Sequence, residues 1–199
     1  MSQEERALER LVVETEFDPM NRAKMKALVH YVIAKSDPSR LGAVRLNKIL
    51  FYIDSIAFRA DGQSVTGGTY VKRQLGPVPK DILSILGELE HENAIVIRNR
   101  DRFGMSMREF IARTEADTSA SLSDDELALT ESVRSVICED FTANGISALS
   151  HDKVWEAANI GEVIPLAATL VAGEGEFRDE TYKWADSVVA RYEAIQKVA

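Results

Sequence analysis

Apolar residues recur three or four positions apart in several long segments of this chain, which is the periodicity of amphipathic helices. They predict helices over 3–14, 19–36, 43–59, 80–90 and 124–144, then a short helix capped by Ser150 and a last helix over 176–197. Ser123 with Glu126 forms the capping-box pattern that begins the fifth of these. The segment 43–59 is apolar around most of its circumference, which is typical of a helix at the centre of a core.

Between these helices lie shorter segments with strand propensity. Residues 69–74 predict one strand, and residues 94–97 and 105–113 predict a β-hairpin whose turn spans 98–104. We expect a basic tip on this hairpin, made by Arg98, Arg100, Arg102 and Arg108. The sequence Gly-Pro-Val-Pro at 76–79 cannot be helical, because each proline moves its predecessor out of the α region. We interpret it as a rigid corner that leads into the helix 80–90.

These elements predict a mainly helical α+β fold, a compact helical domain with a small antiparallel sheet or hairpin. The helix, strand, helix, hairpin order of residues 43–113 is that of a winged helix. A chain of 199 residues suits one hydrophobic core, so we expect a single domain over 1–199. Its core would span 19–170, with the helices 3–14 and 176–197 outside that core.

The charge is unevenly distributed along the chain. The net charge is −8, but residues 40–113 carry +4 and residues 114–199 carry −11. This predicts two electrostatically different faces, and the acidic total weighs against general nucleic-acid binding. The single cysteine, Cys138, and the absence of an apolar leader predict a reducing cytoplasm, and no run is long enough to span a membrane.

We find no motif for catalysis, metal binding or cofactor binding. The three histidines and Cys138 are far apart in sequence, and no phosphate-binding loop or nucleophile motif occurs. We therefore predict no enzyme activity, no metal and no cofactor. His151 and Trp155 are four residues apart on a predicted helix and can touch, either as an aromatic core pair or as part of a functional surface.

Four motifs occur in order: VRLNKILFYID, then a Gly-x-x-Val at 62–65, then LGPVPKDI, then LSHDKVWEAANIGEVIP. This set resembles the Panacea antitoxin domain family, SocA-like, over residues 25–166. The matching positions are Lys48, Ile49, Leu50, Tyr52, Gly76, Pro77, Val78, Ser150, His151, Trp155, Gly161, Glu162, Ile164 and Pro165. One departure is Asn47, where the family often has glutamine before the lysine.

The resemblance implies an antitoxin that binds and neutralises a protein toxin encoded beside it, in a bacterium or a phage. In SocA-like members it also implies delivery of the toxin to a protease. We predict the contact surface at the corner and the hairpin, with two aromatic residues beside them. The predicted partner-binding residues are Lys72, Arg73, Gly76, Pro77, Pro79, Lys80, Arg98, Arg100, Arg102, His151 and Trp155.

Two alternatives remain open. The acidic half after residue 113 would suit a basic toxin that acts on nucleic acid, and is an equally good candidate for the contact surface. A winged-helix DNA-binding regulator is the second alternative, with the helix 80–90 in a groove and the arginine hairpin as the wing. The oligomeric state is not predicted.

Overall fold

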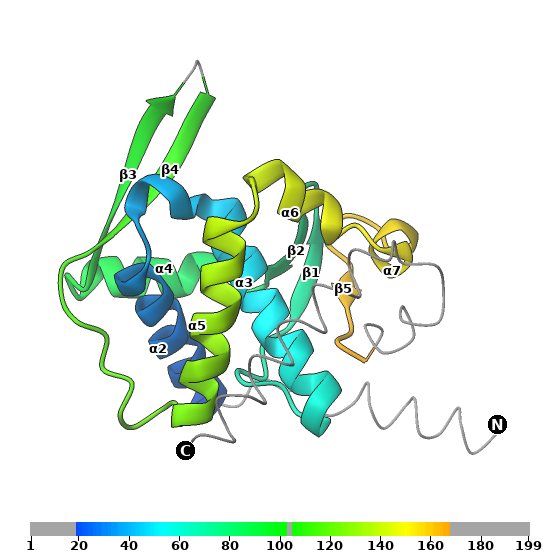
Figure 1. Ribbon diagram of the computed structural model, residues 1–199, viewed down its shortest axis with the longest axis horizontal. Coiled ribbons are helices and arrows are strands. Elements are labelled where there is room, and N and C mark those ends of the chain that lie inside the picture. Colours follow the sequence, from blue (N-terminus) through cyan, green and yellow to red (C-terminus); the bar gives the residue numbers. More distant parts are fainter. Residues whose placement is uncertain (1–18, 103–104, 168–199) are drawn as a thin grey trace.

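The computed structural model of the protein describes residues 19–102 and 105–167, and within them it contains six helices and five strands (Figure 1). The fold is mixed α+β and mainly helical, which confirms the predicted class. In chain order the elements are α2 (Pro19–Lys35), α3 (Pro38–Asp61), β1 (Tyr70–Arg73), β2 (Gly76–Pro79), α4 (Ile82–His91), β3 (Ile95–Arg102), β4 (Met105–Ala112), α5 (Asp124–Glu139), α6 (Ala143–Leu149), α7 (Lys153–Ala157) and β5 (Val163–Ile164).

Helix α3 is the central element, as its apolar circumference predicts. It packs against α2, α5 and α6 and also contacts the strands β2 and β4. The helix begins at Pro38, earlier than predicted, because Asp37 accepts a hydrogen bond from the backbone N–H of Ser39 (2.8 Å) and caps it. Gly42 adopts a positive φ of 56° and kinks the helix after this first turn.

The core is formed where α2, α4 and α5 pack around α3. The strongest apolar positions of the predicted helices are buried there, so the periodicity correctly identified the inward faces. Residues with at most 1% of their surface exposed include Met25, Leu28, Val29, Val32, Leu46, Ile49, Leu50, Ile53, Ile85, Val133 and Ile137.

The segment Gly-Pro-Val-Pro is an edge strand and not a corner, which corrects the sequence interpretation. It forms β2 of a three-stranded antiparallel sheet of order β2–β1–β5, in which Val78 lies opposite Val71. The N–H of Lys80 donates to the carbonyl of Thr69 (2.8 Å), so hydrogen bonding to β1 alternates and skips Pro77 and Pro79. Both prolines therefore occupy edge positions where no N–H is needed.

Strand β5 was not predicted. With two residues it is too short to show an alternating pattern, and its pairing with β1 depends on contacts distant in sequence.

The β3–β4 hairpin was predicted, but its turn was placed too early. Arg98 to Arg102 continue strand β3, with Arg98 opposite Glu109 and Arg100 opposite Met107. Arg98 and Arg100 therefore lie along β3 and Arg108 along β4, and of the four predicted tip arginines only Arg102, opposite Met105, is next to the turn. The hairpin extends from the body of the protein (Figure 1), where polar residues occupy both faces and no apolar alternation marks the strand.

The helices after residue 123 are divided differently from the prediction. The capping box of Ser123 and Glu126 is present, but α5 ends at Glu139, and Thr142 caps a separate helix α6. Asn144 and Gly145 therefore lie in the first turn of α6 and do not end α5. The N-cap of α7 is Asp152, whereas Ser150 is the C-cap of α6.

The predicted helices 3–14 and 176–197 lie outside the described residues. Among the described residues, none of the helices combines the length and the apolar character that crossing a membrane requires.

Candidate functional site

Eight of the eleven predicted contact residues lie on or beside β1 and β2. The other three, Arg98, Arg100 and Arg102, lie on β3. Figure 1 shows the hairpin and the three-stranded sheet on opposite sides of α3. We call the surface at the β1–β2 turn the sheet end, and it comprises Lys72, Arg73, Leu75, Trp155, Ile160 and Val163.

Trp155 is held in place at the sheet end by several contacts. Its indole N–H donates to the carbonyl of Arg73 (3.2 Å), and the imidazole of His151 stacks on its ring at 3.6 Å with an interplanar angle of 2°. The Nζ of Lys72 lies 4.0 Å from the centroid of the indole and donates to the carbonyl of Ala158 (2.9 Å). His151 and Trp155 touch as predicted, although His151 precedes α7 and is not part of it.

Apolar side chains are exposed on the β1–β2 turn and on the segment that pairs with β1. Leu75, Ile160 and Val163 expose 53%, 60% and 50% of their surface, and they are three of the five large apolar residues that are exposed in the described part. Arg73 is also exposed and lies next to Gly161. Two backbone hydrogen bonds of Lys72, to Gly161 and Glu162, fix the segment before β5 against β1.

Beneath the turn lies a buried lysine. Lys48 exposes only 1% of its surface, and its Nζ donates to the carbonyl of Pro77 (3.3 Å). Burial lowers the pKa of Lys48 to about 7. Lys48 is one of the positions that carry the family resemblance, but the sequence alone predicts no role for it. A lysine inside the apolar run Leu-Asn-Lys-Ile-Leu was the available signal.

Gly76 is required where this lysine meets the turn. Its φ is +104°, and an added Cβ would lie 1.9 Å from the Nζ of Lys48 and 2.4 Å from the Oγ of Ser150. The glycine of the Gly-Pro-Val motif therefore allows three groups from separate elements to meet.

Helix α6 holds the other side of the turn. The hydroxyl of Ser147 donates to the carbonyl of Leu75 (3.1 Å) and lies 3.5 Å from the Nε2 of His151. Burial lowers the pKa of His151, and the positive charges of Lys48 and Lys72 lower it further. The turn is thus fixed by groups from both α3 and α6.

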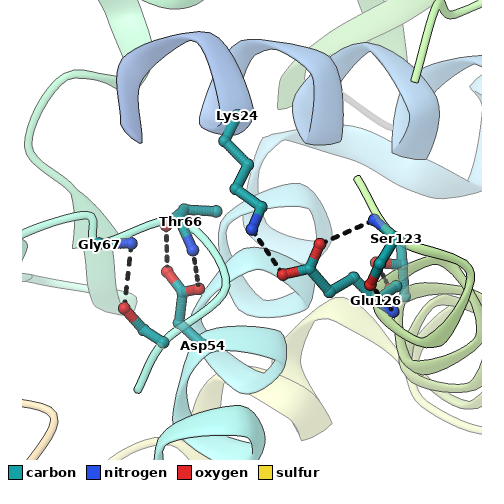
Figure 2. Close-up of polar contacts among 8 residues, drawn as sticks. Lys24, Asp54, Thr66, Gly67, Ser123 and Glu126 are labelled. Atoms are coloured by element: carbon teal, nitrogen blue, oxygen red, sulfur yellow. Dashed lines mark hydrogen bonds and ion pairs between the residues drawn. The ribbon is translucent and has the colours of Figure 1, made fainter. Parts of the chain in front are cut away.

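A second buried network holds the other end of β1 (Figure 2). The carboxylate of Asp54 on α3 accepts from the backbone N–H of Thr66 (2.9 Å) and from its hydroxyl, and the hydroxyl of Tyr70 lies 2.8 Å from Oδ2. Burial raises the pKa of Asp54 to about 6, although these hydrogen bonds oppose the shift. This network fastens β1 to α3, and sequence analysis missed it.

The cations of the sheet end and its neighbours Lys48 and Lys80 differ from those on α2 in their partners. Among the described residues, no carboxylate forms an ion pair with Lys48, Lys72, Arg73 or Lys80. By contrast, each basic side chain of the middle of α2 has a carboxylate partner. The ion pairs are Arg22–Glu88, Lys24–Glu126 and Lys26–Glu92.

Several acidic side chains after residue 113 have local structural roles. Glu126 belongs to the capping box of α5, Asp152 caps α7, and Glu131 pairs with Arg134. Part of the acidic charge in this half of the chain therefore stabilises the N-terminal ends of helices.

The hairpin is a weaker candidate for a binding surface. Arg98 and Arg100 are exposed, but Arg100 pairs with Glu109 (3.2 Å) above a small hollow next to Gly42. Helix α4, which would enter a groove in a winged-helix complex, contains no lysine or arginine and carries Glu88 and Glu90.

Within residues 19–102 and 105–167, no group of three His, Cys, Asp or Glu side chains could hold a metal ion. What the sheet end offers chemically is an apolar surface with cationic groups, which is suited to binding another macromolecule.

Residues 46–156 match the family described as antitoxin SocA-like, Panacea domain. The match covers more than half of the 199 residues. The chain belongs to this family. No match was found among curated proteins or among solved structures. The matched part of the Panacea domain includes Lys48, the Gly76 turn, Ser150, His151 and Trp155, and it ends before β5.

Proposed function

We propose that this protein is an antitoxin that neutralises a cognate protein toxin by binding it directly through the sheet end. Membership of the SocA-like antitoxin family supports the class of function. The observation that carries the proposal is that exposed apolar side chains lie on the β1–β2 turn and the segment paired with β1, together with Arg73 and the Lys72–Trp155 contact. Neutralisation would be stoichiometric, because a preformed surface covers the working site of the toxin.

The frame beneath the sheet end supports this mechanism. Lys48 and Asp54 on α3 and Ser147 on α6 hold the turn and the start of β1 in place, so little backbone ordering is needed on binding. A standard interface requires about 800 Å² from each partner. The six residues of the sheet end would form its centre, and neighbouring surface would complete it.

A role as proteolytic adaptor, which the resemblance implies for some members, needs a second surface that stays free when the toxin is bound. The exposed β3–β4 hairpin is an element that could supply it, since it lies on the opposite side of α3. We do not propose DNA binding, because helix α4 carries Glu88 and Glu90 and has no lysine or arginine.

The direct test is to express the neighbouring open reading frame with and without this protein. We expect its product to arrest growth alone, and we expect co-expression of this protein to restore growth and to yield a co-purifying complex. If no neighbouring product is toxic, or if a toxic product does not bind this protein, the proposal is wrong.

A matched pair of variants then tests the surface. The double variant Leu75→Asp, Ile160→Asp places charge on the sheet end and should abolish both rescue and co-purification. Leu83→Asp is the control, because Leu83 is 67% exposed on α4 and lies outside the sheet end. Circular dichroism of both variants shows whether they remain folded. Equal rescue by both would exclude the sheet end as the toxin-binding surface.

A further inference from the structure

The sheet end holds positive charge that the fold itself does not use in ion pairs. The ammonium of Lys72 is satisfied by the carbonyls of Glu156 and Ala158 and by the face of Trp155. Arg73 is exposed and does not pair with a carboxylate among the described residues. A carboxylate that arrived from outside would therefore meet cations without displacing an existing ion pair.

Among the described residues, the nearest carboxylates form no ion pair with Lys72 or Arg73. Glu162 accepts from the backbone N–H (2.7 Å) and the side-chain amide (3.1 Å) of Asn159, and Glu156 contributes its carbonyl, not its side chain, to Lys72. Burial lowers the pKa of His151, and Lys48 and Lys72 lower it further, while Glu156 and Asp152 oppose the shift. Arg73 thus lies exposed without an ion pair to a described residue, in a chain whose net charge is −8.

Exposed apolar side chains lie close to Arg73 along the chain and across the sheet end. Leu75 follows Arg73 by two residues in the turn, and Arg73 reaches Gly161, the neighbour of Ile160. A tryptophan and an arginine within an apolar surface are the residue types that carry most of the energy in protein interfaces.

We infer that the sheet end binds a segment of the toxin in which an aspartate or glutamate lies next to an exposed apolar side chain. This rests on the proposed function for the identity of the partner, and it specifies the chemistry of the contact. The carboxylate would bind Arg73, the only exposed cation within the sheet end as the described residues form it, and the apolar side chain would pack on Leu75 and Ile160.

Two other occupants fit the surface less well. A second copy of this chain in a two-fold interface would place the cations of the sheet end against the same cations of its partner, which repel. A nucleic-acid backbone would need a run of exposed cations, whereas half of the sheet end is apolar.

The test uses a random 12-residue peptide library displayed on phage and selected on the full-length protein. We expect the selected peptides to share an acidic residue beside a leucine, phenylalanine or tryptophan. Affinity of a selected peptide should fall ~30-fold or more in Arg73→Glu, because the reversed charge repels the carboxylate that Arg73 would bind. Arg98→Glu makes the same charge change at an exposed arginine of the hairpin and should leave the affinity unchanged.

Peptides with a basic consensus, the lack of any consensus, or equal affinity of the two variants would each overturn the inference. Self-association of the wild type that Arg73→Glu abolishes would also overturn it, because the occupant would then be a second copy. The acidic-apolar consensus is independent of toxicity. If it appears while no neighbouring product is toxic, the proposed function fails and the chemistry of the surface stands.

Discussion

The middle of α2 and the sheet end carry similar numbers of basic residues and use them differently. On α2, Arg22, Lys24 and Lys26 each pair with a carboxylate on α4, α5 or the residues just after α4. At the sheet end, Lys72 bonds to carbonyls, and Arg73 has no ion pair with a described residue. Charges that pair within the fold connect helices, whereas unpaired charges beside exposed apolar groups remain available to a partner.

The contacts that support the sheet end also differ from those that hold α2, α4 and α5 together. Helix packing on α2, α4 and α5 is apolar, with ion pairs at the surface, whereas the turn at Gly76 rests on a buried lysine. Stability at the sheet end should therefore be sensitive to single polar or glycine substitutions, and stability at the α2 ion pairs should not.

The largest effect is expected at Gly76. Gly76→Ala should lower the free energy of unfolding by about 2–4 kcal/mol, because φ is +104° and a Cβ would overlap Lys48 and Ser150. Gly87→Ala is the control on α4, where nothing lies within 4 Å of an added Cβ, and it should stabilise by about 0.5–1 kcal/mol. Urea denaturation of both measures the difference, and similar effects at the two glycines would contradict the tight meeting of groups at the turn.

A smaller, pH-dependent effect is expected at Lys48. Its folded pKa of about 7 lies below the ordinary value of 10.5, so burying the charged form destabilises the protein fully below pH 7. Between pH 7 and 10.5 the unfolded state holds more protons, so this group makes stability rise with pH. Lys48→Met should therefore stabilise by about 1–3 kcal/mol at pH 6.5, after loss of the hydrogen bond to Pro77, and by less at pH 9.5.

Denaturation curves at pH 6.5, 8 and 9.5 check this change. Lys80→Met at an exposed position is the control and should show no such trend. A stability difference between wild type and Lys48→Met that stays constant with pH would show that Lys48 keeps its charge throughout the range.

The smallest effect is expected at the Lys24–Glu126 ion pair, whose atoms are 2.6 Å apart with side chains 28% and 23% exposed (Figure 2). A double-mutant cycle of Lys24→Ala and Glu126→Gln should give a coupling energy of about 0.3–1 kcal/mol, since water screens the pair. The cycle cancels the separate loss of the capping box at Glu126. A coupling energy above this range would show that the ion pair on α2 stabilises the fold as strongly as buried contacts do. That result would contradict the difference between α2 and the sheet end.

Most of the described helices could be predicted from the sequence, because local periodicity and capping residues identify a helix. The inward faces of α2, α3 and α4 and the capping box of α5 follow from residues within a few positions of each other. The elements that were predicted wrongly or not at all share one cause. The strand β2, the strand β5 and the division of α5 from α6 depend on pairing and capping that local patterns leave ambiguous.

The candidate site was predicted as a set of residues but not as an arrangement. The sequence grouped Lys72 and Trp155 with the hairpin arginines, and only the fold shows that α3 separates them. Lys48 and Asp54 gave a signal, since each is a charged residue in an apolar helix, but their partners are 12 to 29 residues away. Such partners cannot be inferred from spacing alone.

The affinity of the toxin for two charge-reversal variants tests the central claim most directly. Isothermal titration of the purified toxin into Arg73→Glu and Arg98→Glu compares the sheet end with the hairpin at equal change of charge. We expect Arg73→Glu to weaken binding by ~30-fold or more relative to wild type, and Arg98→Glu to bind as wild type does. Loss of affinity in Arg98→Glu with none in Arg73→Glu would move the binding surface to the hairpin and contradict the account.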